Sequence, residues 1–477
     1  MMLVRRFYDT KLAQASYLIG SMDTGEAVVI DANRDLDQYT RAAAEDAVRV
    51  THVTETHIHA DYLSGSRDLA AETGATLLLS DEGGPNWKYA FASEPNVVLL
   101  KDGSTFNVGS VRIDVLHTPG HTPEHLTFLV TDTDAANEPL AAVTGDFIFV
   151  GDVGRPDLLE RAANIKGTME AGARQLFTSI QRFKSLPDFL QLWPGHGAGS
   201  ACGKALGAVP QTTLGYERRF NWAFTMSDEQ AFVDQVLAGQ PDPPRYFAEM
   251  KRMNRTGPRR RSDVPAPRRL PADAIDRLVK QHALVIDTRP AAEFATGHVP
   301  GTINIAMSKA FTTWAGWLVP YTVDFYVIVD AAGANTLEHT RADLSMIGLD
   351  RLAGYFLWDE LAGQRAALES THQISAQELD AQIREGGVHV LDVRSHAEWR
   401  EGHIAGAQHI PLGELRDRVK EVPTDRPVVV HCLGGTRSAI GASLLQASGV
   451  RGTIDFAGGF NAWRAAGLET EAATTTV

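Results

Sequence analysis

The chain has 477 residues, of which 44% are hydrophobic and 22% are charged, and its formal net charge at pH 7 is −14. This composition is typical of a globular protein, and the length suggests about three domains. The negative charge argues against nucleic acid or an anionic membrane as a partner, and no apolar run approaches the roughly 20 residues that span a bilayer. With no evident signal peptide and only two cysteines, we expect a reduced, cytoplasmic protein.

The first predicted elements are short strands and one helix, at 16–20, 27–31, 35–48 (the helix) and 48–54. The last strand leads into the sequence Thr-His-Ile-His-Ala-Asp-Tyr, which starts at residue 56. Alternation in an extended loop lets His57 and Asp61 point to one side, with His59 near enough to join them. Neutral imidazole and carboxylate together suit zinc, iron or manganese. The stretch therefore predicts part of a metal site that needs distant partners.

Three later stretches can supply these partners, and each follows or ends an apolar run that reads as a strand. They contain His117 and His121, then Asp146, then His196. Strand ends that carry loops with His and Asp are how a sheet-based enzyme builds a metal cage. The order His-x-His-x-Asp, Gly-His, Gly-Asp, Gly-His resembles the metallo-β-lactamase superfamily over roughly the first half of the chain. The resemblance implies an αββα sandwich.

Position 62 bears on the kind of metal site. The two-zinc hydrolases of that superfamily have a histidine there, whereas this chain has Tyr62, whose phenol is a poor zinc ligand because its pKa lies near 10. The resemblance to the persulfide dioxygenase branch implies one Fe(II) per chain, held by a facial set of two imidazoles and one carboxylate: His57, His121 and Asp146. The hydrogen-bond partners that orient these ligands would be His59, Asp61 and His196. A dinuclear site completed by those same three residues is the structural alternative.

Two further residues near these motifs are candidates for substrate chemistry. Arg155 lies in the loop 151–157 after Asp146, and it matches the arginine that persulfide dioxygenases present to substrate. The alternative for Arg155 is a solvated surface position. Cys202, six residues after His196, is either a small buried cysteine or a thiol near the iron that accepts or relays sulfur.

A change of composition marks the end of the first domain, which we place at 1–245. From Pro241 to Pro271 arginines stand among prolines, with little apolar content. An arginine run could bind an acidic partner, but in a chain of net negative charge it favours an interdomain linker, which we place at 246–270.

Beyond this stretch the chain repeats itself at an offset of 105 residues. The residues Asp287, Arg289, Glu293 and His298 return as Asp392, Arg394, Glu398 and His403. Strand, turn, short helix, Gly-His turn and strand form an α/β unit with a parallel sheet. The pattern Asp-x-Arg, Glu-[Phe/Trp], Gly-His-[Ile/Val] resembles the rhodanese domain. It predicts two such domains, over 271–368 and 369–472.

The two copies differ where chemistry would occur. In the second copy Cys432 follows a strand, and the loop then enters a helix predicted over 439–447. Backbone N–H groups, the helix N-terminus and Arg437 favour a thiolate and would hold an anionic persulfide. The substrate-binding residues expected in this loop include Gly434, Gly435 and Thr436. The loop from Cys432 to Arg437 has six residues, one fewer than cysteine phosphatases need, which favours sulfur transfer. In the first copy we align Ala331 with the cysteine, so that copy resembles an inactive rhodanese domain.

The domain order resembles that of bacterial persulfide dioxygenase–rhodanese fusions. The resemblance implies that Fe(II) and O2 oxidise a persulfide to sulfite, and that the rhodanese cysteine transfers sulfane sulfur to form or use thiosulfate in sulfide detoxification. The implied partners are a persulfide of glutathione, coenzyme A or a similar thiol, O2, sulfite and thiosulfate, and we expect a homo-oligomer. Two alternatives stay open: a zinc-dependent thioester hydrolase of the glyoxalase II kind fused to a sulfurtransferase, and rhodanese copies that act as binding or regulatory modules.

Overall fold

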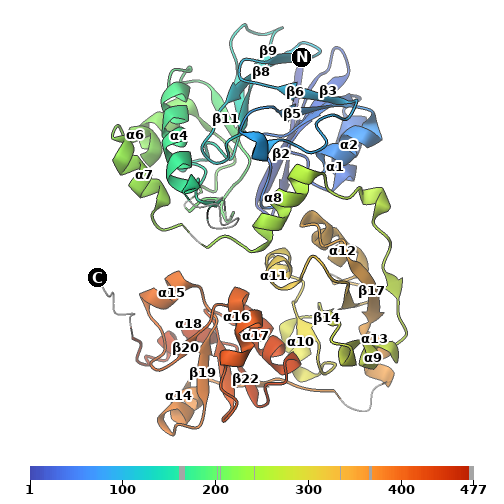
Figure 1. The fold of residues 1–477 in the computed structure, drawn as a ribbon, viewed down its shortest axis with the longest axis vertical. Coiled ribbons are helices and arrows are strands. Elements are labelled where there is room, and N and C mark those ends of the chain that lie inside the picture. The colour runs from blue at the N-terminus through green and yellow to red at the C-terminus, as the bar shows by residue number, and fades with distance from the viewer. Residues whose placement is uncertain are drawn as a thin grey trace. The chain divides into compact units, whose positions relative to one another are not determined.

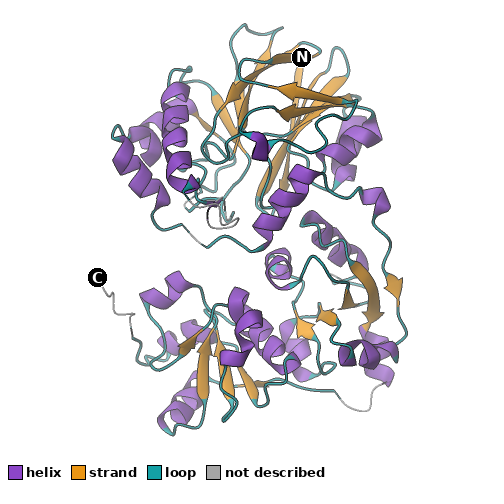
Figure 2. Cartoon of the chain, viewed as in Figure 1, coloured by secondary structure: helices purple, strands orange, loops and turns teal. Residues whose placement is uncertain are grey.

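The computed structural model describes residues 1–158, 160, 167–200, 202–204, 206–240, 242–333, 335–364 and 368–471. The chain divides into two compact units, namely residues 1–264 with 345–348, and residues 265–344 with 349–477. Both units combine strands and helices (Figure 2). Within the described residues, no helix has the length and apolar character needed to cross a membrane.

The first unit is built on two six-stranded sheets that enclose an apolar core, with Leu18 and Val53 on the outer face of one sheet and Val28 and Phe128 between the sheets. One sheet has the order β1 (Met2–Asp9), β2 (Gln14–Ser21), β3 (Glu26–Ile30), β4 (Arg49–Thr54), β5 (Thr76–Ser80), β6 (Val97–Leu100). The other has the order β12 (Thr212–Thr213), β11 (Gln191–Pro194), β10 (Ala141–Gly145), β9 (Leu126–Asp132), β8 (Val111–His117), β7 (Thr105–Val108). Both contain parallel and antiparallel pairs.

Helices cover the outer faces of both sheets (Figure 1). On the first sheet, α1 buries Leu36, Tyr39, Ala42 and Ala43, a helical spacing that directs one apolar face inward. The helices of this unit are α1 (Leu36–Glu45), α2 (Ser66–Thr73), α4 (Thr168–Phe183), α5 (Leu214–Phe220), α6 (Trp222–Thr225), α7 (Glu229–Leu237) and α8 (Tyr246–Thr256), with 3-10 turns at Pro85–Trp87 and Arg261–Asp263. The predicted αββα sandwich is confirmed.

The stretch 246–270, which we expected to be a linker, is structured at its start. Helix α8 buries Tyr246, Phe247, Met250 and Asn254, and the first unit extends to Val264. Arg252 of this helix is exposed, whereas its few apolar residues share one buried face. A composition rich in arginine and proline therefore concealed a short amphipathic helix, and the first domain does not end at 245.

The second unit contains two five-stranded sheets, one in each copy of the repeat, and both are parallel, as predicted. Corresponding strands also stand in the same order in the two sheets. The first copy contains β13 (Arg268–Arg269), β17 (Leu352–Leu357), β16 (Phe325–Val329), β14 (Leu284–Asp287), β15 (Ile303–Asn304), α9 (Ala274–Lys280), α10 (Ala291–Thr296), α11 (Phe311–Leu318), α12 (Leu337–Met346) and α13 (Trp358–Gln364). The second contains β18 (His372–Gln373), β22 (Thr453–Phe456), β21 (Val428–His431), β19 (His389–Asp392), β20 (Gln408–His409), α14 (Ala376–Arg384), α15 (His396–Glu401), α16 (Leu412–Arg418), α17 (Thr436–Ala447), α18 (Gly459–Ala465) and a 3-10 turn at Val419–Glu421.

The two rhodanese-like copies, which we predicted as separate domains, pack into one compact unit. The backbone N–H of Asn304 in the first copy donates to Ser443 Oγ in the second at 2.9 Å. The guanidinium of Arg416 donates to the Leu318 carbonyl at 2.5 Å. The predicted end of the last domain at 472 lies outside the described residues.

The repeated Asp-x-Arg motif has one structural role in both copies. Arg289 forms a bidentate pair with Asp287, and Arg394 forms the same pair with Asp392, with closest N···O distances of 2.7 and 2.6 Å. Each guanidinium also donates to the carbonyl of the glycine in the following Gly-His turn, at 3.0 and 2.7 Å. Both arginines are buried, so the motif ties the strand end to the turn in each copy.

Strand register corrects our alignment of the two copies. In the second copy the residue opposite Asp392 immediately precedes Cys432. In the first copy the residue opposite Asp287 immediately precedes Val329. Val329, and not Ala331, therefore occupies the cysteine position. Valine, like alanine, has no thiol. We therefore still expect that the first copy cannot carry sulfur covalently.

Candidate metal centre and sulfur-transfer loop

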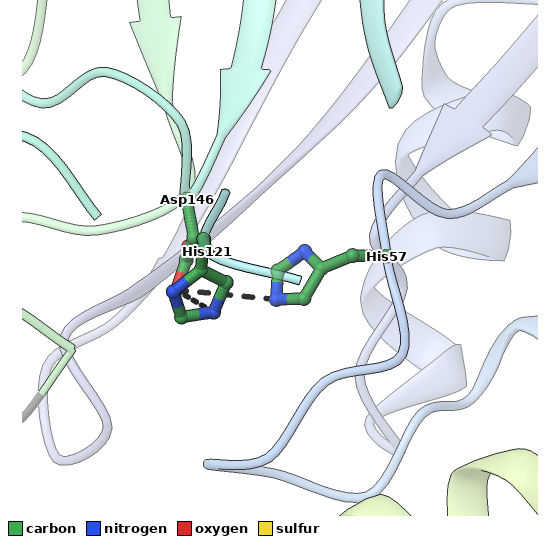
Figure 3. A group of neighbouring side chains, drawn as sticks. All are labelled: His57, His121 and Asp146. Atoms are coloured by element: carbon green, nitrogen blue, oxygen red, sulfur yellow. Dashed lines mark ion pairs between the residues drawn. The ribbon is translucent and has the colours of Figure 1, made fainter. Parts of the chain in front are cut away.

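Three predicted ligands meet at the ends of strands from both sheets of the first unit. His57 follows β4, His121 lies between β8 and β9, and Asp146 follows β10. Figure 3 shows the two imidazoles directed toward the carboxylate. Oδ2 of Asp146 lies 3.5 Å from His121 Nε2 and 4.0 Å from His57 Nε2, and all three side chains are buried.

Two glycines allow the chain to approach Asp146 closely. Gly145 has a φ of +49°, and a Cβ there would lie 2.5 Å from the hydroxyl oxygen of Thr56. A Cβ on Gly154 would lie 1.7 Å from the carbonyl oxygen of Asp146. A larger residue at either position would displace the backbone that carries the carboxylate.

A chain of hydrogen bonds sets the tautomer of His57. The Thr56 hydroxyl donates to Asp31 Oδ2 at 3.0 Å, so its oxygen is free to accept from His57 Nδ1 at 2.9 Å. The lone pair of His57 is then on Nε2, the atom that faces Asp146. Partners of this kind fix the orientation of metal-binding histidines. Asp31 was not among the residues that the sequence indicated.

His121 is fixed in the same way, by the backbone of the loop after Asp146. Its Nδ1 donates to the carbonyl of Arg155 at 3.0 Å, which leaves the lone pair on Nε2. Burial lowers the pKa of His121 to about 3, and burial with neighbouring imidazoles lowers that of His57 well below its usual value. Both rings are therefore neutral at pH 7.

These three side chains fit a metal cation. Two imidazole lone pairs face one carboxylate with no proton between them, and burial raises the pKa of Asp146. The Nε2 atom of His57 and both oxygens of Asp146 have no hydrogen-bond partner among the described residues. Buried polar atoms are rarely left in this state, and a divalent cation would satisfy all of them. His57, His121 and Asp146 can thus hold a metal ion.

A second group of possible ligands adjoins the first, formed by Asp61, His196 and Cys202. His196 donates from Nδ1 to the Ala13 carbonyl at 3.0 Å, and its Nε2 lies 3.3 Å from Asp61 Oδ2. The same Nε2 lies 3.4 Å from Asp146 Oδ1, so the two oxygens of Asp146 face different groups. Cys202 is buried, and burial together with Asp61 and Asp146 raises its pKa well above the usual value. Its thiol is therefore protonated at pH 7.

His59 is not part of either ligand group. Its Nε2 lies 3.0 Å from Asp31 Oδ1. Burial opposes protonation of His59, but the Asp31 carboxylate raises its pKa to about 9. The Tyr62 phenol donates to the Asp31 carbonyl at 3.1 Å, and burial raises its pKa well above 10. Tyr62 is thus held away from both groups as a hydrogen-bond donor.

Arg155 is neither solvated nor free to swing toward a substrate. Its side chain is fully buried, and its guanidinium forms a bidentate pair with Asp157 at 2.8 and 2.7 Å. The surface alternative for Arg155 is therefore wrong. The contact that Arg155 makes with the metal site runs through its backbone carbonyl and His121.

Besides Asp31, two further positioning residues were missed in the sequence. His125 Nε2 accepts from the backbone N–H of Asp146 at 3.1 Å. Asn254, on α8, donates to the carbonyls of His59 and Tyr62 at 2.9 and 2.8 Å and accepts from the Ser64 N–H at 2.9 Å. Asn254 lies in the stretch that we read as a linker, and no local pattern there indicated its role.

The predicted sulfur-transfer loop lies between β21 and α17. Cys432 is buried at its start, and the N–H of Gly435 donates to Cys432 Sγ at 3.1 Å. Gly435 has a φ of +105°, and a Cβ there would lie 2.1 Å from the Ala457 carbonyl. Helix α17 begins at Thr436, three residues earlier than predicted, so its N-terminus faces the sulfur. Gly434 and Thr436 are exposed at the rim.

Arg437 has a different orientation from the one we expected. Its guanidinium forms a bidentate pair with Glu398 of α15, with both N···O distances at 2.6 Å. Burial alone would raise the pKa of Glu398, but hydrogen bonds from Arg437 and Ser395 lower it to about 2. Arg437 therefore joins the loop to the repeated motif.

Comparison with known proteins agrees with this architecture. A Metallo-beta-lactamase superfamily model matches residues 9–196, and a Rhodanese-like domain model matches 270–348 and 375–466. A crystal structure titled as a metallo-beta-lactamase from Staphylococcus aureus subsp. aureus COL is 43% identical, with 75% of this chain and 99% of that chain covered and a TM-score of 0.68. The chain belongs to the metallo-β-lactamase superfamily. It carries rhodanese-like domains after the metal-binding fold.

Two curated relatives have names that indicate different reactions. A probable metallo-hydrolase of Burkholderia pseudomallei (strain 1710b) is 33% identical over 220 residues, which cover 41% of this chain and 72% of the relative. The mitochondrial persulfide dioxygenase of Bos taurus is 24% identical over 237 residues, which cover 48% of this chain and 78% of the relative. The proteins similar to this chain thus include both a probable hydrolase and a dioxygenase.

Proposed function

We propose that the first unit is a persulfide dioxygenase with one Fe(II) per chain, bound by His57, His121 and Asp146, and that the last rhodanese-like copy is a sulfurtransferase. The observation that carries the proposal is the set of two neutral imidazoles and one carboxylate, converging with unpartnered atoms, beside a phenol that is not a ligand. Such a set leaves coordination positions open and is typical of non-haem Fe(II) oxygenases. Similarity to a persulfide dioxygenase adds support.

The overall reaction balances as R–S–SH + O2 + H2O → R–SH + H2SO3. The outer sulfur loses four electrons, which reduce O2, and the S–S bond breaks with the thiol as leaving group. Iron in the site would supply the redox chemistry that joins oxygen to sulfur. The protein fixes both imidazoles through Thr56 and the Arg155 carbonyl, and burial of all three ligands excludes bulk water.

The rhodanese step would use Cys432 as the nucleophile. Its thiolate attacks the outer sulfur of thiosulfate, the S–S bond breaks, and sulfite leaves while Cys432 becomes a persulfide. The reverse direction moves sulfane sulfur onto sulfite and forms thiosulfate. The Gly435 N–H and the N-terminus of α17 would stabilise the anionic sulfur. The product of the first unit is thus a substrate of the second.

The test combines metal analysis with two activities on the protein reconstituted with Fe(II) without oxygen. We expect one iron per chain, oxygen uptake with glutathione or coenzyme A persulfide, and sulfite as the product. Cys432→Ser should spare oxygen uptake and abolish sulfur transfer from thiosulfate, because a hydroxyl cannot carry sulfane sulfur. Mass analysis for an added sulfur on Cys202 or Cys432 identifies the thiol that holds the intermediate. Loss of oxygen uptake in Cys432→Ser would contradict two separable sites.

A zinc-dependent thioester hydrolase is the second candidate. The group formed by Asp61, His196 and Cys202 favours it, because Asp146 faces both groups and could bridge two metals. The similarity to a probable metallo-hydrolase also favours it. Two tightly held zinc ions per chain, with thioesterase activity and no persulfide-dependent oxygen uptake, would establish this candidate over the dioxygenase.

A further inference from the structure

A cavity in the first unit adjoins the loop that carries His121. Gly120 and Pro123, which flank that histidine, form part of its wall, together with residues of α4, α8 and the 3-10 turn Pro85–Trp87. Its volume is about 490 Å³, which is within the range of small-molecule sites. Neither the metal ligands nor the sulfur-transfer loop line it.

The charge of this cavity is one-sided. Its described lining includes Lys251, Arg252 and Arg255, all on α8, and no carboxylate. The guanidinium of Arg252 pairs with Glu249 at 2.8 Å. Lys251 and Arg255 are four residues apart and share a helix face, and no ion pair is found for either among the described residues. Arg255 therefore supplies a full positive charge, and Lys251 adds to it when protonated.

Both cations are held in place by the 3-10 turn. The ammonium of Lys251 lies 3.7 Å from the centre of the Trp87 ring, a cation–π contact. Arg255 donates from Nη1 to the carbonyl of Asn86 at 2.9 Å, which leaves other guanidinium donors for a ligand. Burial lowers the pKa of Lys251 to about 7, although the Glu124 carboxylate opposes this fall, and a ligand anion beside Lys251 would stabilise its charged form further.

The start of α4, although it lines the cavity, is already capped. The N–H groups of Gly167, Thr168 and Met169 all donate to one carboxylate oxygen of Glu160, at 2.9 to 3.3 Å. The helix end therefore has less capacity for another anion. Recognition of a negative ligand falls to the two cations on α8, while small lining residues such as Ala171, Gly172 and Ala248 leave room for its chain.

We propose that this cavity binds the anionic end of the thiol carrier, so that the enzyme selects persulfides with at least two negative charges away from the sulfur. The inference rests on the proposed function and names its substrate class. A phosphate-bearing carrier such as coenzyme A and a carboxylate-bearing one such as glutathione share this chemistry. Cysteine persulfide, which has a single carboxylate close to the sulfur, does not.

The test removes each charge while keeping an unbranched side chain, with Lys251→Met and Arg255→Met. The matched control is Arg174→Met on α4, because Arg174 pairs with Glu170 and Glu229 and does not line the cavity. We expect each cavity variant to raise the KM for coenzyme A persulfide or glutathione persulfide about tenfold, the loss typical of one charge-assisted contact. The KM for cysteine persulfide should change less than about twofold. The carrier with the larger rise identifies phosphate or carboxylate recognition.

A binding measurement separates this inference from the proposed function. Calorimetric titration of the metal-free protein with coenzyme A and with glutathione should give a larger Kd in both cavity variants and an unchanged Kd in Arg174→Met. If the wild type shows no persulfide-dependent oxygen uptake, the proposed function fails, and the same titration still decides whether the cavity binds the carrier. Equal KM changes for all three persulfides, or Kd values unaffected by either variant, would overturn the inference.

Discussion

Replacement of Asn254 by alanine tests whether α8 belongs to the metal site. The Asn254 side chain is buried and makes three hydrogen bonds to backbone atoms of the loop that carries the first metal motif. Alanine removes all three. The carbonyls of His59 and Tyr62 and the N–H of Ser64 then lose this partner in a buried environment.

The size of the effect follows from these contacts. A buried backbone group left without a partner costs about 1–3 kcal/mol, and three neighbouring groups do not add fully. We therefore expect Asn254→Ala to lower the free energy of unfolding by about 3–5 kcal/mol. The loop that carries His57 also becomes less ordered before metal binds. Loss of comparable supporting contacts weakens metal affinity about 10–100-fold.

Two measurements check this prediction. Competition with a chelator gives the Fe(II) affinity, and urea unfolding of the metal-free protein gives the stability. Thr256→Ala, at an exposed position on the same helix, removes a hydroxyl that bonds only within α8 and serves as the control. If Asn254→Ala and Thr256→Ala have the same metal affinity and the same stability, Asn254 does not position the loop.

The remaining predictions concern the metal ligands, a buried ion pair and the sulfur-transfer loop. Alanine at any one of the three ligands, namely His57, His121 or Asp146, should abolish bound iron in elemental analysis, and retention of a full equivalent would exclude the assignment. Arg155→Ala should lower the unfolding free energy by about 3–5 kcal/mol, because Asp157 loses its buried bidentate partner; a change in KM alone would contradict this. Glu398 has a pKa lowered from 4.5 to about 2 in the folded state, so its stabilising effect is present above pH 4.5 and is lost as pH falls toward 2. Across that window the stability of Glu398→Gln should fall less steeply than that of the wild type, and parallel curves would refute the pair.

The ligand set could be predicted because its signal is local. His57, His121 and Asp146 each stand at or just after the end of an apolar strand, and the carboxylate and imidazole types restrict what they can bind. The sandwich could be predicted for a similar reason, since alternating and continuous apolar runs mark the strands. Both inferences need only residue types and spacing along the chain.

Other parts of the site depend on contacts between distant segments. Asn254 reaches the metal loop across almost 200 residues of sequence, from a helix whose arginines and prolines suggested a linker. Asp31 anchors the same loop from the end of β3, where a lone aspartate gives no distinctive pattern. The bidentate pairing of Arg155 was equally hidden, because Asp157 is an ordinary turn residue in the sequence.

The rhodanese signature itself predicts a fold more securely than a reaction. In both copies the Asp-x-Arg pair ties a strand end to a Gly-His turn, so the motif persists for structural reasons whether or not a thiol follows. The connection from Asp287 to its partner in β16 spans 41 residues, against 39 from Asp392 to its partner in β21. Our alignment with Ala331 read the strand as running past Val329, where β16 ends, and so placed the cysteine position two residues too late. Glu398 meets Arg437 beside the Cys432 loop, whereas Glu293 is exposed in the first copy. The proposed sulfur transfer therefore depends on the loop and its ion pair, and the repeated motif only supplies the frame that holds them.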